Sequence, residues 1–295
     1  MMLECIISAY TLSVLSLEDA RASERQLMAS GWLISIASIA FSYSSPVKKM
    51  SKERPLNSLF HPAIFVSILG QALIHLFCMV TAVKMATEAM GEEELAEVRE
   101  FNRLARLGEQ EEPEFDEDAD WSAEFMFMWS KPFRPNLLNT VVFLVETAQM
   151  NAVLFVNYKG RPWMKGMLEN HALFMSVFIC VAAVAACAWG IFPTANSMLH
   201  LAPFPTDEFR WKTMGLVATS LLGTFIWDRI VTAIFARDIF KAMMREAAKT
   251  TPLDLIPVFM SAFKVFGGLL VLGSGNPLIW IGAFYAYRKY GRSSS

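Results

Sequence analysis

Six long apolar stretches alternate with polar connections along the chain. Each approaches or reaches the roughly 20 residues that a helix needs to cross the hydrocarbon core of a bilayer. The backbone polar groups of a span in lipid must be paired internally, which predicts that every stretch is an α-helix. The expected spans are 3–17, 27–43, 62–83, 137–158, 172–192 and 214–235.

The last part of the chain is also apolar, and its pattern leaves two arrangements open. Residues 252–287 contain two short apolar pieces separated by a Gly- and Pro-containing break at residues 273–277. Each piece is short for a span, so the pattern fits either an apolar hairpin at the membrane interface or one tilted crossing. We therefore expect an all-α, polytopic helical membrane bundle with six transmembrane helices in residues 1–238. A cytosolic or interfacial tail, residues 239–295, follows it.

Positive charge is concentrated in three connections and predicts the orientation of the spans. Short cytosolic connections of membrane proteins are enriched in Lys and Arg. The basic connections follow the second, fourth and sixth spans and contain Lys48, Lys49, Lys52 and Arg54, then Lys159, Arg161 and Lys165, then Arg237, Lys241, Arg245 and Lys249. The other connections are mixed or acidic. Six spans then alternate without conflict, with the amino end in the cytosol.

The connection between the third and fourth spans differs from the others in length and charge. Residues 85–135 hold 15 acidic and 5 basic side chains. Their central sequence, GEQEEPEFDEDADW, cannot bury enough apolar surface to fold alone. We expect a lumenal loop with an amphipathic helix over residues 91–107 and a disordered, solvated segment over residues 108–120. An acidic surface that attracts cations or faces a substrate is the alternative.

The composition argues against several classes of protein. Of the 295 residues, 54% are hydrophobic and 18% are charged, whereas a soluble domain usually has about 25% charged residues. The net charge of −2 and the lack of an aromatic and basic module give no indication of nucleic-acid binding. The four cysteines lie inside apolar stretches without metal-ligand spacing, so we expect no metal site.

Polar side chains within the spans are the candidate functional residues. Asn139, Glu146 and Gln149 are spaced by seven and three residues and therefore share one face of a helix. A carboxyl group at membrane depth is costly and normally faces protein or water. This face either lines a pathway for something that enters the membrane, or forms hydrogen bonds between helices with Glu146 protonated. The hydroxyl groups of Ser8 and Tyr10 are a second candidate lining, or they bond within their own helix.

No catalytic motif is recognisable in the chain. It has no Asp in a DKTG-like setting, no Walker loop, no HExxH and no GxSxG. None of the connections predicted to be cytosolic is long enough to fold as a separate catalytic domain. We therefore expect that this chain alone catalyses no reaction and holds no cofactor.

Several segments of the chain occur together in an order and spacing that resemble one family. They are ISAYTLSVLSLEDA, SSPVKKMSKERP, FVSILGQALIHL and PNLLNTVVFLVETAQMNAVLFVNYKGRPW, followed by LHLAPFPTDEFRWK and FIWDRI. Together they resemble the carboxyl-terminal membrane domain of the P-type ATPases of the fifth class, subclass A. The resemblance covers residues 3–238 and implies that the six spans correspond to the fifth to tenth spans of such a pump.

The resemblance implies a function for a longer parent protein. Pumps of this family are helix dislocases of the endoplasmic reticulum membrane, which use ATP and Mg²⁺ to remove wrongly inserted transmembrane polypeptide segments. By resemblance, the polar residues that would border the substrate pathway are Ser8, Tyr10, Asn139, Glu146 and Gln149. The phosphorylated aspartate and the nucleotide domain of the family have no counterpart in this sequence. We therefore expect a membrane-domain fragment, of the kind that a truncated gene model produces.

Two other hypotheses stay open from the sequence. The second is a free-standing, non-enzymatic membrane protein that assembles with another subunit. The third is a small secondary transporter that uses Glu146 as its proton site. The sequence pattern of the first three spans is not repeated in the last three. Many secondary transporters contain such an internal repeat, so its absence from these spans disfavours the third hypothesis. In all three cases the surrounding partner is the lipid bilayer.

Overall fold

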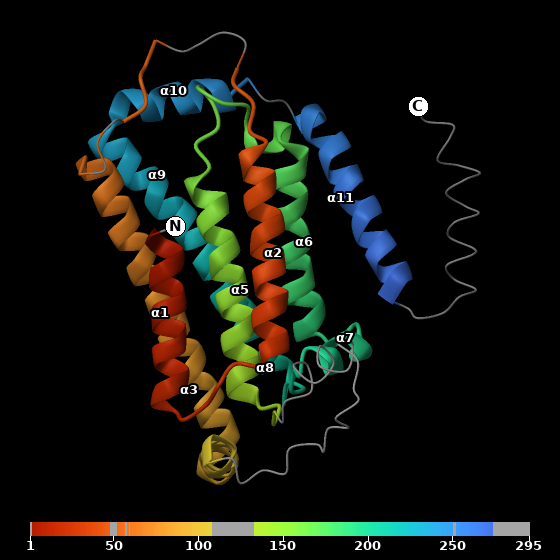
Figure 1. The fold of residues 1–295 in the computed structure, drawn as a ribbon. Helices are drawn as coiled ribbons and strands as arrows, with labels where there is room; N and C mark the ends of the chain where they lie inside the picture. The colour runs from red at the N-terminus through yellow and green to blue at the C-terminus, as the bar shows by residue number, and fades with distance from the viewer. Residues whose placement is uncertain are drawn as a thin grey trace, which may run out of the picture.

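The computed structural model describes residues 2–47, 52–56, 58, 60–107, 133–249 and 252–273, and all regular secondary structure within these ranges is helical. One isolated bridge, between Pro46 and Met164, has β geometry. The long helices pack side by side as a bundle (Figure 1). The predicted all-α, polytopic membrane architecture is confirmed.

Six helices of the bundle contain the six predicted apolar stretches. Those long and apolar enough to cross a membrane are α3 (Pro62–Leu107), α5 (Leu137–Asn157), α6 (His171–Ala188) and the combined helix Asp207–Phe235. Beside them lie α1 (Met2–Leu17) and α2 (Glu24–Ser42) (Figure 1). α1 is apolar but has only 16 residues, and α2 begins with a charged turn at Glu24 and Arg25. These two helices therefore fall short of the length or apolar character of a full span.

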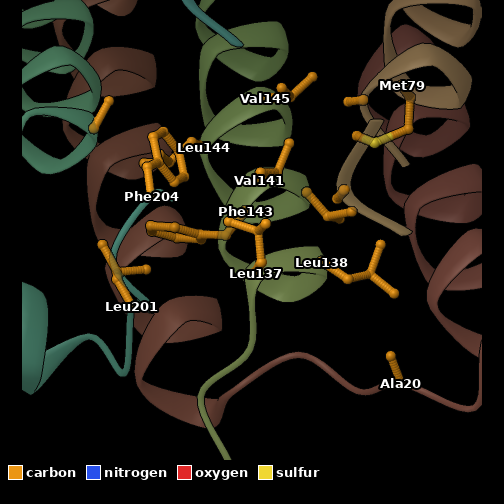
Figure 2. Close-up of a cluster of buried hydrophobic side chains, with 14 of the residues drawn as sticks. Ala20, Met79, Leu137, Leu138, Val141, Phe143, Leu144, Val145, Leu201 and Phe204 are labelled. Carbon is orange, nitrogen blue, oxygen red and sulfur yellow. The ribbon is translucent and has the colours of Figure 1, made fainter. Parts of the chain in front are cut away.

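α5 is the central helix of the bundle, because α1, α2, α3, α6, α8 and α9 all contact it. Its apolar side chains fill the core shown in Figure 2, in which Leu138, Val141 and Val145 are fully buried. Buried residues lie on all sides of α5, as is typical of a helix enclosed by others. Helices in lipid gain little hydrophobic energy from meeting, so close packing of these side chains holds the bundle together. The polar residues of α5 must therefore face other helices.

α3 contains a break that divides it into a membrane span and a surface helix. Gly91 has φ 75° and ψ 170°, a conformation that residues with a side chain rarely adopt. Residues 91–107 continue as a helix, as the amphipathic pattern predicted, with Val98 buried. The Asn102 amide donates to the carbonyl oxygen of Asp19 at 2.9 Å. This contact fixes the surface helix to the connection between α1 and α2.

The last predicted span is longer than expected and contains an irregular turn. The helix consists of α8 (Asp207–Ala218), a π-helical turn (Thr219–Gly223) and α9 (Thr224–Phe235). The Thr206 hydroxyl accepts a hydrogen bond from the Phe209 backbone N–H at 3.1 Å and so caps the helix start. The apolar pattern predicted a later start, because the first turns of α8 are charged.

The described part of the tail forms two helices. α10 (Arg237–Ala247) lies across one end of the bundle, and α11 (Pro252–Gly273) stands beside α6 (Figure 1). α11 ends at the predicted break between the two apolar pieces. The second piece lies outside the described residues, and so does the predicted disordered segment 108–120. The choice between a hairpin and a tilted crossing stays a prediction.

The three basic connections, predicted to be cytosolic, meet at one end of the bundle, which we call the basic end. The backbone N–H of Lys165 donates to the carbonyl oxygen of Ser45 at 2.9 Å, which joins the connections after α5 and α2. The guanidinium of Arg245 donates to the Glu53 carboxylate at 2.8 Å, which joins α10 to the connection after α2. The basic connections are therefore neighbours in space as well as alike in charge.

The connections predicted to be lumenal meet at the opposite end. The guanidinium of Arg99, in the surface helix of α3, lies 2.8 Å from the carboxylate of Glu18 at the end of α1. The side-chain amide of Gln26 donates to the carbonyl oxygen of Leu199 at 3.0 Å. Successive connections thus lie at opposite ends of the bundle, as their charges predicted. The assignment of the basic end to the cytosol stays a prediction.

Candidate functional site

Gln149 joins three helices in the interior of the bundle. Its side-chain oxygen accepts a hydrogen bond from the Tyr10 hydroxyl of α1. Its amide nitrogen donates to the carbonyl oxygen of His75 in α3 at 2.9 Å. Gln149 is fully buried, and a buried amide without partners would be costly. These two hydrogen bonds therefore hold α1 and α3 in a fixed relation to α5.

Some polar atoms in this interior have no partner within the described ranges. His75 and Ser220 are both fully buried. Neither ring nitrogen of His75 forms a hydrogen bond with the described residues, whereas the Ser220 hydroxyl interacts with the Cys78 thiol. Buried polar groups without partners are uncommon in native proteins, and such groups commonly bind water or a ligand. The interior beside His75 of α3 therefore has capacity for further polar contacts.

Asn139 and Glu146 face a separate, small cavity between α1, α2 and α5. The cavity has a volume of about 10 Å³, which is room for about one water molecule. The Asn139 amide donates to the carbonyl oxygen of Arg21 at 3.0 Å, while the Asn139 side-chain oxygen has no partner among the described residues. Glu146 forms no hydrogen bond within the part of the chain that the structure describes. One carboxyl and one amide oxygen are thus left to interact with whatever enters this space.

The structure divides the five sequence-predicted residues into separate groups. Tyr10 and Gln149 are hydrogen-bonded to each other, and Asn139 and Glu146 line one cavity. Ser8 is partly exposed on α1 and makes no hydrogen bond to other described residues. That these residues border a substrate pathway stays a prediction.

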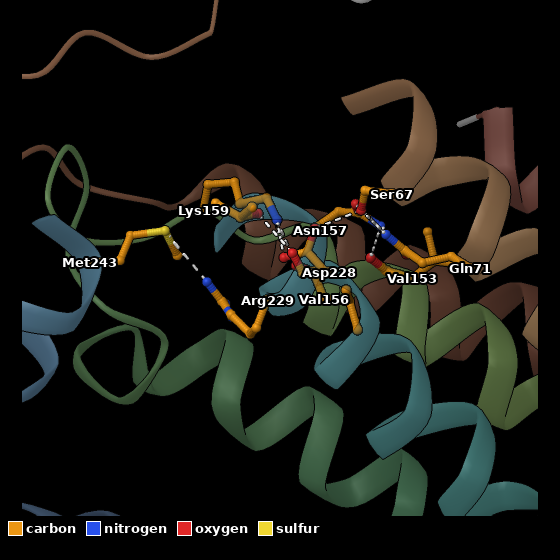
Figure 3. A network of polar contacts seen from close by, with 10 residues as sticks. Ser67, Gln71, Val153, Val156, Asn157, Lys159, Asp228, Arg229 and Met243 are labelled. Carbon is orange, nitrogen blue, oxygen red and sulfur yellow. Dashed lines mark hydrogen bonds and ion pairs between the residues drawn. The ribbon is translucent and has the colours of Figure 1, made fainter. Parts of the chain in front are cut away.

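A second polar cluster lies near the basic end, where α3, α5 and α9 meet (Figure 3). We call it the Asp228 network, and its residues are Ser67, Gln71, Asn157, Lys159 and Asp228. The Lys159 ammonium lies 2.6 Å from one carboxylate oxygen of Asp228. The Ser67 hydroxyl donates to the other oxygen at 2.7 Å. The Asp228 side chain is only 3% exposed, so these donors replace water as its partners.

Side-chain amides extend the Asp228 network to a third helix. The Gln71 amide nitrogen donates to the Ser67 hydroxyl oxygen at 2.9 Å. The Asn157 amide nitrogen in turn donates to the Gln71 side-chain oxygen at 3.1 Å. Connected hydrogen bonds in a low-dielectric interior strengthen one another. The network therefore fixes the ends of α3, α5 and α9 relative to each other.

Lys159 owes its position to the end of α5. The chain leaves the helix at Asn157, and the Lys159 ammonium lies 3.5 Å from the carbonyl oxygen of Val156. A cation is favoured at the carboxyl end of a helix dipole. Desolvation lowers the pKa of the Lys159 ammonium, and the Asp228 carboxylate opposes that shift. The carboxylate therefore keeps this half-buried cation charged.

Sequence reasoning did not single out the Asp228 network, although a signal for it existed. Lys159 follows the fourth predicted span, and Asp228 lies near the end of the sixth. The predicted topology places both ends on the same side of the membrane, so the two opposite charges are at similar depth. Ser67 and Gln71 carry no such signal, because polar residues in a span do not identify their partners.

The fold and these polar clusters define the class of the protein: it is a multi-pass, α-helical membrane protein whose buried polar residues join neighbouring helices. No model of a known protein family matches the chain. It is 28% identical over 234 residues to the endoplasmic reticulum transmembrane helix translocase of Aspergillus fumigatus, covering 79% of this chain and 16% of that protein. It is 29% identical over 223 residues to the translocase of the same name from Saccharomyces cerevisiae, covering 76% and 16%. It is 28% identical over 252 residues to a probable manganese-transporting ATPase of Arabidopsis thaliana, covering 85% and 19%.

The chain is thus similar to endoplasmic reticulum transmembrane helix translocases, and the resemblance to the P-type ATPases of the fifth class, subclass A, found in its sequence motifs is confirmed. It spans between 16% and 19% of the length of these three relatives. The names of two of them place them in the endoplasmic reticulum membrane. The prediction of a multi-pass protein of that membrane is confirmed.

Proposed function

We propose that this chain supplies the membrane-embedded bundle of a helix dislocase, a pump that couples ATP hydrolysis to the removal of transmembrane polypeptide segments from the endoplasmic reticulum membrane. The observation that carries the proposal is the match of 79% of the chain to a protein named as a transmembrane helix translocase. The central position of α5 supports it, because a pump needs a rigid group of helices against which other helices move.

In this proposal the polar residues of the bundle have two roles. Gln149 and Tyr10 are positioning residues, since their hydrogen bond holds α1 against α5. The side-chain oxygen of Asn139, near the start of α5, has no partner among the described residues, and Glu146 lines the same cavity further along the helix. A misplaced transmembrane segment carries polar groups that need partners in the membrane. We propose that Asn139, Glu146 and the partly exposed Ser8 border the path of such a segment.

ATP and Mg²⁺ are assigned to other parts of the pump. The Asp228 network consists of amides, a hydroxyl, an ammonium and a paired carboxylate, and the Asn139 cavity offers a single carboxyl, whereas Mg²⁺ with a nucleotide takes several free carboxylates and phosphate-binding loops. The residues described here do not fit that ligand. ATP supplies the energy when it binds the complete pump. The contribution of this chain is to keep its helices in a fixed arrangement and to border the path of the transmembrane segment.

A chimeric protein tests the proposal. The matching region of the Saccharomyces cerevisiae translocase would be replaced by residues 3–238 of this chain. We expect the chimera to hydrolyse ATP and to remove a wrongly inserted reporter segment from the membrane. A chimera that is stable in the endoplasmic reticulum membrane but removes no reporter contradicts the proposal.

Variants of the same chimera test the residue roles. Glu146→Leu should slow removal of the reporter by about tenfold, because one polar partner is worth on the order of 1 kcal/mol or more. Ile230→Leu is the matched control, since Ile230 is 46% exposed on the outer face of α9. Equal removal by both variants would show that Glu146 does not border the path.

Manganese transport is the second candidate function, and it rests on the name of the Arabidopsis relative. The same chimera distinguishes the two functions. Stimulation of ATP hydrolysis by Mn²⁺, together with uptake of Mn²⁺ into sealed membranes and no effect on the reporter, would favour manganese transport. Removal of the reporter without uptake of Mn²⁺ would favour the helix dislocase.

A further inference from the structure

α10 lies at the level where the membrane-spanning helices end. A single residue, Ala236, separates it from α9, and the φ of −139° and ψ of 54° at this residue break the helix. α10 then runs across the basic end of the bundle, with Ala242 buried (Figure 1). α9 reaches the end of its membrane crossing at Phe235, so α10 begins at the depth of the lipid headgroups.

The exposed face of α10 combines positive charge with an apolar side chain. Arg237, Lys241 and Arg245 are all exposed and are spaced by four residues. Residues four apart lie on the same face of a helix. Met244 lies beside them and is 51% exposed. A basic amphipathic helix of this kind is typical of a membrane surface.

A surface groove of about 790 Å³ follows this face of the helix. Phe240, Lys241, Met244 and Arg245 line one side of it, and Glu53 lines another. Arg245 and Glu53 pair with each other at 2.8 Å, so the positive charge of Arg245 is already compensated. Lys241, in contrast, forms no ion pair or hydrogen bond with the residues that the structure describes.

The segment that contains α10 carries a net positive charge. Residues 237–249 contain four basic side chains and two acidic ones, which is a net charge of +2. One of the acidic residues, Asp238, also lines the groove. It lies in the first turn of α10, where the helix dipole offsets its charge. The other, Glu246, pairs with Arg161 and Lys249.

We propose that this groove binds the headgroup of an anionic phospholipid at the predicted cytosolic surface of the membrane. The uncompensated Lys241 in the groove binds the phosphate oxygens, and the exposed Arg237, one helical turn before it and outside the groove lining, adds to the attraction. Phe240 and Met244 contact the first part of the acyl chains. A lipid held here fixes α10 against the membrane surface and thereby the end of α9. The inference does not depend on the dislocase function, because it concerns lipid binding alone.

Native mass spectrometry of the purified, delipidated chain in detergent tests the proposal. Phosphatidylserine and phosphatidylcholine with identical acyl chains are titrated separately. We expect phosphatidylserine to bind more tightly than phosphatidylcholine. In the double variant Arg237→Gln, Lys241→Gln, phosphatidylserine should bind about tenfold more weakly, because juxtamembrane cations each contribute to the attraction of anionic lipid. Lys84→Gln is the matched control, since Lys84 is exposed on α3, away from the basic end.

Three outcomes would overturn the proposal. Equal affinity for the two lipids would show that negative charge is not recognised. Equal binding of phosphatidylserine by the double variant and by Lys84→Gln would place the lipid elsewhere. Displacement of the lipid by a large excess of inorganic phosphate would show that the groove recognises a free anion and not a membrane lipid. Helical content and melting temperature of each variant would be measured in the same detergent, to establish that all variants are folded.

Discussion

At the scale of single residues, Asp228 shows how a charge is kept within a membrane bundle. Its two carboxylate oxygens accept hydrogen bonds from Lys159 and Ser67, which lie in different parts of the chain. The desolvation of a buried charge is repaid only when the partners are close and well oriented. Removing one partner therefore costs more than removing both.

We expect Lys159→Met to lower the free energy of unfolding by about 2 kcal/mol or more, because it leaves the buried Asp228 carboxylate unpaired. Combining it with Asp228→Asn should restore part of the loss, since the uncompensated charge is then gone. Chemical unfolding of both variants in detergent, followed by helical circular dichroism, measures the difference. Equal stability of the single and the double variant would contradict the assignment of an ion pair.

At the scale of the helices, α3 and α9 approach each other very closely at Gly70. A Cβ atom placed on Gly70 would lie 1.8 Å from the indole nitrogen of Trp227. That nitrogen donates to the carbonyl oxygen of Val66 at 3.1 Å, so the indole ring is held in place. Small residues commonly allow such close packing between membrane helices. Ser67 follows Val66 and Asp228 follows Trp227, so the hydrogen bond between Ser67 and Asp228 depends on the same close approach.

Gly70→Ala should therefore destabilise the bundle by about 1–3 kcal/mol, because the added methyl group has no room. Gly31→Ala in α2 is the matched control, since no heavy atom lies within 4 Å of a Cβ atom at that position. The control should leave stability unchanged or raise it slightly, because Ala favours a helix more than Gly does. The two melting temperatures, measured in the same detergent, test this difference. A Gly70→Ala variant as stable as the control would contradict the close contact.

The helices themselves could be predicted from the sequence, while their polar contacts could not. Apolar stretches of the right length predict helices in lipid, and 137–158 agrees closely with α5. The start of α8 was missed because its first turns are charged and exposed. The π-helical turn leaves no sign in the apolar pattern. Periodicity predicted that Asn139 and Gln149 share a face, but not that Asn139 bonds the connection after α1 while Gln149 bonds α1 and α3.

At the scale of the whole molecule, the connections gather into two groups at opposite ends of the bundle. Contacts such as Lys165 with Ser45 join the basic connections, and Arg99 with Glu18 joins two of the others. Charge in the connections therefore predicted which segments are neighbours. Positively charged connections are retained on the cytosolic side during insertion. The same effect therefore explains why Lys and Arg are concentrated in alternate connections and why these connections meet at one end of the bundle.

Labelling of introduced cysteines tests the predicted sidedness. Lys165→Cys at the basic end and Lys212→Cys at the opposite end both replace exposed residues. Each is made together with Cys5→Ser, because Cys5 is itself exposed. A membrane-impermeant maleimide added to sealed microsomes should label Lys165→Cys, whereas Lys212→Cys should react only after the membrane is opened. Labelling of Lys212→Cys alone in sealed microsomes would reverse the assigned orientation.

The ion pair between Lys159 and Asp228 also has a consequence for biosynthesis. The two residues are 69 positions apart in the sequence. A chain that is made from its amino terminus therefore completes α5 and exposes Lys159 well before α9 leaves the ribosome. During that interval the ammonium has no carboxylate partner, and the end of α5 is held by packing alone. The pair can form only after α9 has entered the bilayer, so α5 and α9 become joined at this end at a late stage of their insertion.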